Sequence, residues 1–380
     1  MTATKLSAPV SLDALSVRHW LGLFALVALA LAPIWTQLLY AGGAGILLVR
    51  TLTGALFFGM FAMSWDVVSG YTGQISFGHS LFFAVGGYAS ALLNQGWNVP
   101  PAVAVLLATG LAVLAGLLIG VPALRLEGPY LSLVTLVAPL ILLQIFIVYS
   151  DIFGGELGVS NPEPIVSVAG GFRAETVAFF YVALGLFVFI LALLLAVTRS
   201  DAGSVFTAIR EDEQAVAAAG LNPAKFKTFA FVLSAAVGGL AGAVFVHTVG
   251  SPSPSQLLVM TVSIEVIIAA IVGGMGTIVG AAVGGIFLDV FREWLGNVSA
   301  SIPGIGISVA DLDLFLFSAI TLLILFVLPG GILRWGILRG RSIVSQDEST
   351  PVTDGGSTPL ERTLESYRDA LGWDEGDLDE

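Results

Sequence analysis

Long apolar stretches separated by short polar segments make up most of the chain. A hydrocarbon core about 30 Å thick is crossed by roughly 20 apolar residues in a helix. The pattern therefore predicts an all-α fold, a polytopic membrane bundle of about eight to ten transmembrane helices. The candidate stretches run near residues 20–40, 44–66, 74–94, 99–121, 130–149, 176–198, 226–248, 257–273, 275–295 and 311–328.

Four of these stretches contain polar or charged residues, which makes them weaker candidates. Short or re-entrant helices are tolerated in a membrane where protein or a water-filled cavity surrounds the polar backbone. The residues concerned are Arg50 in 44–66; Gln74, Ser76, His79 and Asn94 in 74–94; Glu265 in 257–273; and Asp289 and Arg292 in 275–295.

Lysine and arginine in the connecting segments predict the orientation, because cations are retained on the cytoplasmic side. Residues 199–227 hold four cations and the segment after 328 holds Arg334, Arg339 and Arg341, whereas 150–175 holds only Arg173 among four acids. Ten crossings with both termini in the cytoplasm satisfy these assignments. Eight crossings with two re-entrant pairs satisfy them equally well.

Composition divides the chain into a cytoplasmic N-terminal segment (1–19), a transmembrane domain (20–335) and an acidic cytoplasmic tail (336–380). Residues 341–380 have a net charge of −8, while the other 340 residues have −4. The tail has few large apolar residues to offset the entropy of folding, so we expect it to be mostly disordered. A halophile-like, salt-rich cytoplasm favours such an acidic, lysine-poor surface, and an ordinary acidic tail explains it as well.

Glycines cluster within several of the apolar stretches. Val-Gly-Gly occurs at 85–87, 237–239, 272–274 and 283–285, and Gly242 lies one turn after the second copy. Small residues allow helix backbones to approach closely in lipid, so these clusters predict a tightly packed bundle.

Several kinds of chemistry are excluded by the motifs. The chain has no cysteine, none of its three lysines lies in a phosphate-binding G-x-x-x-x-G-K-[ST] loop, and its three histidines lack metal-ligand spacing. A G-x-S-x-G elbow and a basic patch for nucleic acid are also missing. We therefore expect no catalytic residue, metal or cofactor in this chain, and any ATP must be used by another subunit.

The longest polar insertion in the membrane region is 199–227. It predicts a loop, a short helix from about Gly203 to Ala219, and a stop at Gly220 with Asn222 and Pro223 behind it. One face of the helix is apolar, and the other is charged. Such a helix suits a membrane surface or a groove of a partner protein, and the alternative is a solvated connector. The charged face consists of Arg210, Glu211, Asp212 and Glu213.

Ionisable residues inside a membrane are costly and are therefore functional candidates. Glu265 is the strongest, since no basic residue lies near it in the sequence, although a protonated hydrogen-bonding role is equally open. His79 could line a pathway or bond a neighbouring helix. We expect the arginines at 50 and 292 to pair with the aspartates at 66 and 289 or to reach the membrane surface.

Six segments occur in an order that is specific in combination. They are GYTGQISFGHSLFFAVGGYASALL (70–93), LRLEGPYLSLVTL (124–136), FGGELGV (153–159), SDAGSVFTAIREDEQAVAAAGLNPAKFKTFAFVLSAAVGGLAGAVF (200–245), SIEVIIAAIVGGMGTIVGAAVGG (263–285) and FVLPGGI (326–332). Over roughly residues 44–335 the chain resembles the permease subunit of ABC importers for branched-chain amino acids, specifically the M-type subunit.

The resemblance implies a multi-pass subunit of the cell membrane that moves a zwitterionic aliphatic amino acid. Its expected partners are an H-type permease, two cytoplasmic ATPases that bind ATP and Mg²⁺, and an external substrate-binding protein. The helix at about 203–220 is similar to the family's coupling helix, which fits a groove on an ATPase. Glu213, Ala217, Ala218 and Gly220 correspond to the family's Glu-Ala-Ala and glycine positions, with the alanines shifted relative to Glu213.

Three further readings stay open at this level. Urea or short-chain amide importers have closely similar permeases. An ion-coupled secondary transporter would account for membrane carboxylates such as Glu265 and for broken helices, but it leaves the coupling-type helix unexplained. A membrane scaffold accounts for the composition alone. Within the resemblance, 70–93 is where we expect pathway-lining groups, with Gln74, Ser76 and His79 as candidates.

Overall fold

A computed structural model describes residues 17–40, 43–124, 129–159, 162–250, 253–297, 312–327 and 331–333. The acidic tail and all but the last three residues of the expected N-terminal segment lie outside these ranges. Within them every long element is a helix, which confirms the all-α prediction. The short helices are α7 (Ser150–Phe153), η2 (Gly155–Leu157), α9 (Asp201–Glu211), α10 (Glu213–Ala218) and α12 (Pro254–Leu257).

Five helices of the described chain are long and apolar enough to cross a membrane, and each covers one of the expected stretches. Apolar composition over 19 residues or more satisfies the length that the hydrocarbon core requires. These helices are α3 (Ala44–Thr72), α5 (Pro101–Ala123), α6 (Pro129–Val148), α8 (Gly171–Thr198) and α11 (Pro223–Val246).

Two helix pairs are bent, and counting each as one span raises the number of crossings to as many as seven. α1 (Val17–Ala30) and α2 (Ala32–Leu39) meet at 64°, where Pro33 lies in the first turn of α2. α13 (Met260–Gly274) and α14 (Ile278–Gly296) meet at 120°. Gly274 and Gly276 have φ values of +128° and +76° in this second bend, a conformation that glycine adopts without steric cost.

The expected stretch at 74–94 begins its helix later than predicted. Gly73 ends α3 with φ +72°, and α4 (Ser80–Trp97) starts only after a non-helical segment, residues 73–79. Side chains of α3 hold this backbone, because the Trp65 indole donates to the carbonyl of Ser76 at 2.7 Å and Ser69 Oγ donates to that of Gln74 at 3.0 Å. The last expected stretch forms α15 (Asp313–Val327).

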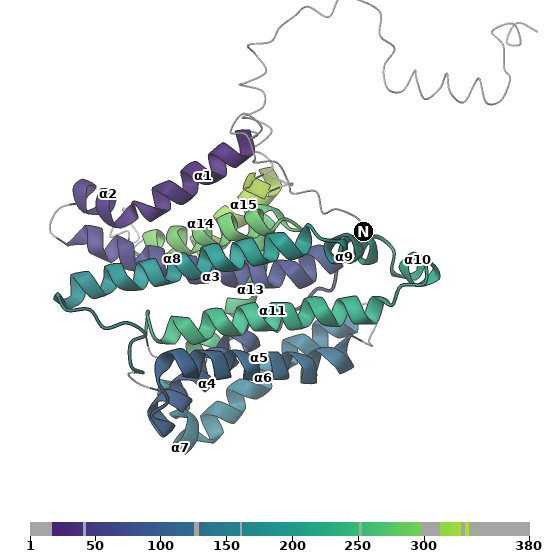
Figure 1. The fold of residues 1–380 in the computed structure, drawn as a ribbon, viewed down its shortest axis with the longest axis horizontal. Coiled ribbons are helices and arrows are strands. Elements are labelled where there is room, and N and C mark those ends of the chain that lie inside the picture. The colour runs from purple at the N-terminus through teal and green to yellow at the C-terminus, as the bar shows by residue number, and fades with distance from the viewer. Residues whose placement is uncertain are drawn as a thin grey trace, which may run out of the picture. The chain divides into compact units, whose positions relative to one another are not determined.

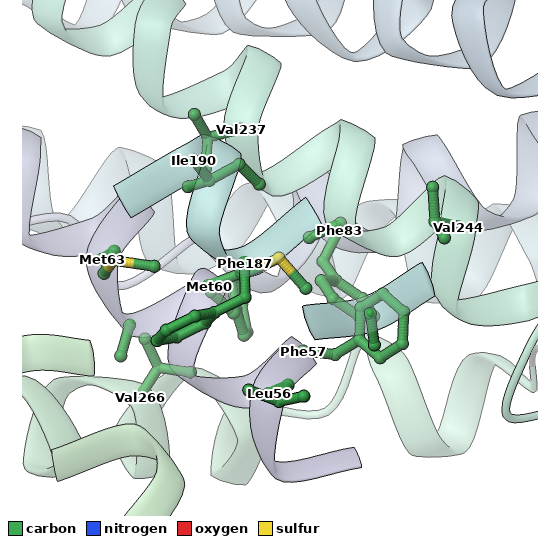
Figure 2. Close-up of a cluster of buried hydrophobic side chains, with 14 of the residues drawn as sticks. Leu56, Phe57, Met60, Met63, Phe83, Phe187, Ile190, Val237, Val244 and Val266 are labelled. Atoms are coloured by element: carbon green, nitrogen blue, oxygen red, sulfur yellow. The ribbon is translucent and has the colours of Figure 1, made fainter. Parts of the chain in front are cut away.

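α3 and α11 lie at the centre of the bundle. In each, 67% of the most apolar window is buried inside the protein, against 22–33% for α5, α6 and α8, whose remaining surface is available to lipid. α3 packs on α8, α11 and α14, while α11 also packs on α4 and α5 (Figure 1). Figure 2 shows the apolar contacts around α3, where Phe57 and Met60 lie among side chains of α4, α8, α11 and α13.

Glycines bring α4 and α11 into backbone contact. A Cβ added at Gly86 would overlap the carbonyl of Gly239, and one added at Gly242 would overlap the carbonyl of Phe83. Larger residues would hold the two helices apart, and dispersion between close backbones is a main source of helix association in lipid. The predicted role of these glycines in close packing is therefore confirmed for α4 and α11.

Gly242→Ala should lower the stability of the protein by about 1–3 kcal/mol, because the new methyl group forces α11 away from α4. The midpoint of thermal unfolding in mild detergent measures the effect. Gly110→Ala in α5 is the matched control, since no atom of a neighbouring described element lies within 4 Å of a Cβ added there, and its midpoint should stay unchanged or rise slightly. Equal midpoints for the two variants would contradict the close crossing.

Candidate functional site

The polar insertion folds as two helices instead of the single helix predicted from Gly203 to Ala219. α9 ends at Glu211, and Asp212 takes an extended conformation with φ −156° and ψ 102°. The Asp212 carboxylate accepts hydrogen bonds from the backbone amides of Gln214 and Ala215, both at 2.9 Å, and so caps α10. Aspartate is more favourable at the N-cap of a helix than inside one, so a new helix begins after Asp212. The predicted single helix did not take this preference into account.

α9 is anchored to the bundle by its apolar face. Phe206 and Ile209 are buried, and α9 contacts α3, α8 and α11. Gly203 contacts the backbone of Thr198 at the end of α8, where a Cβ would overlap the Thr198 carbonyl. Figure 1 shows α9 and α10 together at one end of the long helices.

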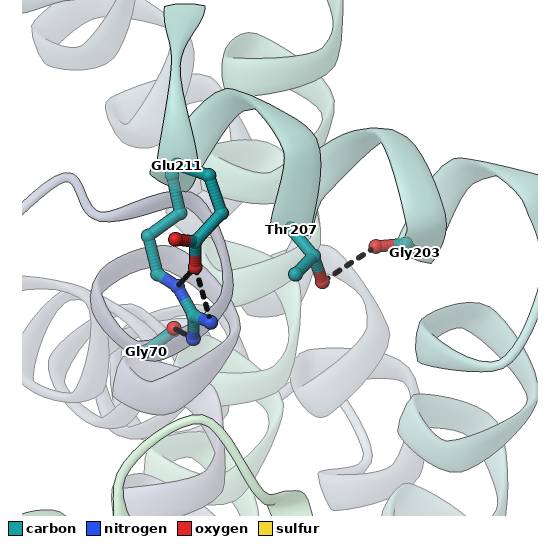
Figure 3. Close-up of polar contacts among 5 residues, drawn as sticks. Gly70, Gly203, Thr207 and Glu211 are labelled. Carbon is teal, nitrogen blue, oxygen red and sulfur yellow. Dashed lines mark hydrogen bonds and ion pairs between the residues drawn. The ribbon is translucent and has the colours of Figure 1, made fainter. Parts of the chain in front are cut away.

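Arg210 joins α9 to the end of α3. Its Nη1 donates to the carbonyl of Gly70 at 2.9 Å, and its Nη2 forms an ion pair with Glu211 Oε1 at 2.9 Å (Figure 3). Charge-assisted bonds to a helix C-terminal carbonyl are favourable, because that end has a partial negative charge. The ion pair with Glu211 is exposed and contributes little by itself.

Arg210 also lies beside the bend between α13 and α14. A Cβ added at Gly276 would be 2.9 Å from Arg210 Nη1, and the amide of Gly276 donates to Asp66 Oδ1 of α3 at 2.7 Å. Three parts of the chain therefore meet here: the end of α3, the end of α9 and the bend.

α10 is held to α11 by an ion pair. Lys227 Nζ lies 2.7 Å from Glu213 Oε1, and the lysine side chain is 7% exposed while the glutamate is 45% exposed. Removing one partner would leave the other charge without compensation in a partly buried position. Gly220 follows α10 with φ +85°, which turns the chain toward α11.

Small residues make up most of the exposed surface of α10 after its first turn. Val216 is the buried residue of this helix, while Ala217, Ala218 and Gly220 are exposed together with Gln214. This surface has little side-chain bulk, so a partner groove can approach its backbone closely. α9 and α10 thus form an exposed projection that is fixed to α3, α8 and α11 and is available to a partner.

His79 is buried at the start of α4 and bonds two neighbouring helices. Its Nε2 lies 3.0 Å from Ser64 Oγ of α3 and 2.6 Å from Ser234 Oγ of α11. Both hydroxyl hydrogens are already donated to carbonyls, those of Phe61 and Ser64, so Nε2 must supply the proton to the serine oxygens. Of the two roles open to His79 in the sequence, this geometry favours the bond between helices.

Gln74 and Ser76 lie in the non-helical segment 73–79 with His79. Gln74 is half-buried and its side chain donates to the Thr72 carbonyl at 3.4 Å. Ser76 is buried, and its Oγ has no hydrogen-bond partner within the described residues. These three candidates therefore share one segment, packed between α3 and α6, where Ser132 Oγ donates to the Ile75 carbonyl.

Glu265 is paired, contrary to the expectation from its sequence neighbourhood. Arg292 Nη1 of α14 lies 2.6 Å from Glu265 Oε1 and 2.7 Å from Oε2. The expected pair of Arg292 with Asp289 is therefore wrong. The 120° bend folds α14 back along α13 and brings together residues 27 positions apart, which no local pattern reveals.

Arg50 and Asp66 also do not pair. They are 16 residues apart on the continuous helix α3, which separates them by about 24 Å at roughly 1.5 Å per residue. Asp66 accepts from Gly276 instead. Lys227 was not singled out in the sequence as a pairing residue, because its partner Glu213 lies on another element.

The chain matches known proteins over most of its length. The family model described as "Branched-chain amino acid transport system / permease component" matches residues 47–325. The high-affinity branched-chain amino acid transport system permease protein LivM of Escherichia coli (strain K12) is 32% identical over 305 residues, covering 74% of this chain and 70% of that protein. No solved structure matches the chain.

More distant relatives extend the comparison. A probable branched-chain amino acid transport permease protein LivM of Methanocaldococcus jannaschii is 25% identical over 324 residues, covering 73% of this chain and 91% of that protein. The LivH permease of the Salmonella typhimurium high-affinity system is 24% identical over 293 residues, with the same coverage.

Asp212→Ala should loosen α10 by about 1 kcal/mol through loss of its N-cap. Amide hydrogen exchange at Gln214 and Ala215 should accelerate about fivefold, while amides within α9 stay unchanged. Asp212→Asn retains the accepting oxygen and should exchange like the wild type. Unchanged exchange in the alanine variant would show that the cap does not hold α10.

Proposed function

The chain belongs to the family of branched-chain amino acid transport permease components, and on this premise we propose that it is the transmembrane subunit of an ATP-driven importer of branched-chain or related aliphatic amino acids. It is a multi-pass membrane protein with five to seven apolar spans in its described part. In the proposed arrangement it lies in the cell membrane with both termini in the cytoplasm, as the distribution of lysine and arginine favours.

The observation that carries this proposal is the projection formed by α9 and α10. It exposes a small-residue surface and is bonded to the bundle at two points, Arg210 on Gly70 and Glu213 on Lys227. A solvated connector needs neither fixed point. The projection therefore supports docking of α10 into a groove of a cytoplasmic ATPase.

The proposed assembly contains a second permease, two ATPase subunits and an external binding protein. Relatives named LivM and LivH support a pair of two different permeases, this chain being the M-type member. Two separate subunits bind and hydrolyse ATP with Mg²⁺, since no phosphate-binding loop occurs in this sequence. An external binding protein delivers the amino acid.

Coupling in this assembly is a rigid-body movement. When an ATPase displaces α10, the ion pair with Lys227 transmits the force to α11, and Arg210 transmits it to the end of α3 and to the bend beside Gly276. Helices that pack tightly shift as units instead of deforming, so the movement changes the side of the membrane to which the bundle opens. ATP binding favours the conformation that is open to one side of the membrane, and ATP hydrolysis restores the conformation that is open to the other side.

The secondary-transporter alternative loses its main support. The sequence supported it through Glu265 as a free membrane carboxylate and through broken helices, and in the structure Arg292 Nη1 lies within 2.7 Å of both Glu265 carboxylate oxygens. A carboxylate whose two oxygens are both engaged in this way is not free to bind a coupling cation.

Purification in mild detergent at high salt through a C-terminal tag tests the assembly. Mass spectrometry should identify two ATPases, a second permease and a binding protein. Uptake of labelled leucine by the reconstituted complex should require ATP and should not be inhibited by excess urea or acetamide, which separates amino-acid import from amide import. Recovery of the chain alone, together with leucine uptake that does not depend on ATP, would refute the proposal.

Lys227→Gln should uncouple uptake from ATP hydrolysis, because α10 loses its bond to α11. The amount of leucine taken up per ATP hydrolysed should fall about fivefold or more. Lys225→Gln is the matched control: it removes the same charge two residues earlier on the same helix, from an exposed lysine without an ion pair in the described chain. A wild-type ratio in Lys227→Gln would show that this pair does not transmit movement.

A further inference from the structure

A large groove lies between the first half of α3 and the second half of α14, away from the projection. Its volume is about 1060 Å³, slightly above the range of roughly 300–1,000 Å³ found for small-molecule sites. A smaller cavity of about 180 Å³ adjoins it, and Arg50 and Val249 line both. The groove is lined by apolar and charged side chains, among them Leu47, Arg50, Phe287, Asp289, Phe291 and Glu293.

Two opposite charges line this groove without a hydrogen-bonded or ion-paired partner in the described part of the chain. Arg50 and Asp289 both line it, and neither forms a hydrogen bond or an ion pair with any described residue. The Asp289 carboxylate is half-buried, and its Oδ2 lies 3.6 Å from where a Cβ on Gly54 would be. A half-buried carboxylate in a membrane bundle is costly, so a functional partner is the expected reason for keeping Asp289, and the exposed Arg50 side chain is available to the same partner.

Arg292 is close enough to act on Asp289 electrostatically, but its hydrogen bonds go to another carboxylate. Arg292, three residues later on α14, directs its guanidinium to both oxygens of Glu265. Glu293 adds a second carboxylate to the lining, so the α14 side of the groove is acidic while α3 contributes the arginine. The α3 wall of the groove therefore has a cation, and the α14 wall has two carboxylates.

These walls match the chemistry of an aliphatic amino acid. Such a molecule has a carboxylate that a guanidinium binds by paired hydrogen bonds and an ammonium that a carboxylate accepts. Its side chain needs an apolar surface, which Leu47, Phe287 and Phe291 provide. A ligand with a single charge would leave either Arg50 or Asp289 uncompensated.

The groove lies at the opposite end of α3 from the projection. Arg50 precedes Gly70 by 20 residues on one continuous helix, a separation of about 30 Å at roughly 1.5 Å per residue. This is the thickness of the hydrocarbon core. With the projection in the cytoplasm, the groove faces the side from which an importer receives its substrate.

We propose that this groove is a binding site for the transported amino acid, in which Arg50 binds the α-carboxylate, Asp289 binds the α-ammonium and the aromatic side chains of α14 contact the aliphatic group. The assignment rests on the proposed function, and it names the residues of this chain that select a zwitterion.

A leucine analogue with a diazirine in its side chain tests the site in the assembled transporter with its external binding protein. Photolysis should label peptides containing residues 44–54 or 286–297, and excess leucine should suppress the labelling. Labelling confined to other segments, in a preparation that imports leucine with ATP, would overturn the groove and leave the proposed function standing. A preparation that hydrolyses ATP but imports no leucine would overturn both.

Arg50→Gln and Asp289→Asn should each raise the KM for leucine uptake at least about tenfold, with the ATP hydrolysis rate unchanged, because each removes one charge-assisted contact. Arg173→Gln and Asp151→Asn are the matched controls, since they remove the same charges from exposed residues that line neither cavity. Equal KM values in variants and controls would overturn the assignment of these two side chains.

Discussion

The hydrocarbon core of a membrane contains no water, so each polar group inside the bundle must find a partner in the protein. The segment 73–79 shows how this requirement is met where the helix is interrupted. Its exposed carbonyls and amides bond to Trp65 and Ser69 of α3 and to Ser132 and Thr135 of α6. Four backbone groups that leave the helical pattern are thereby bonded to neighbouring helices. The irregular parts of this bundle are consequently among its most strongly connected parts.

Close backbone contact is the second requirement, because lipid provides no hydrophobic force between helices. Gly86, Gly239 and Gly242 allow α4 and α11 to meet along their backbones, and Gly59 with Gly285 does the same for α3 and α14. Because of these contacts, a displacement of α3 or α11 also moves the helix that is packed against it. A force applied at α9 and α10 has a direct route through α3 and α11 to the far side of the bundle.

The sequence predicted the five long spans, the close-packing glycines and the polar projection, since each is written in a local pattern of apolar, small or charged residues. It also predicted that the helical part of the projection ends at about Gly220. It did not predict the pairs Glu213 with Lys227, Glu265 with Arg292 or Asp66 with Gly276. Each joins different helices, and spacing within one helix does not determine which faces meet. The division of the predicted helix into α9 and α10 at Asp212 was missed. The prediction gave more weight to the continuous charged face than to the preference of aspartate for an N-cap.

The bond between Asp66 and Gly276 spans 210 residues of the chain. During synthesis, α3 enters the membrane long before the bend that caps its carboxylate exists. At about 5–20 residues per second, the ribosome needs roughly 10–40 s to produce the missing segment. Throughout that interval Asp66 stands in the bilayer without its partner amide, and the side of α3 that later meets α14 remains uncovered. The central helix of this protein therefore reaches its final packing only after synthesis has entered the last third of the chain.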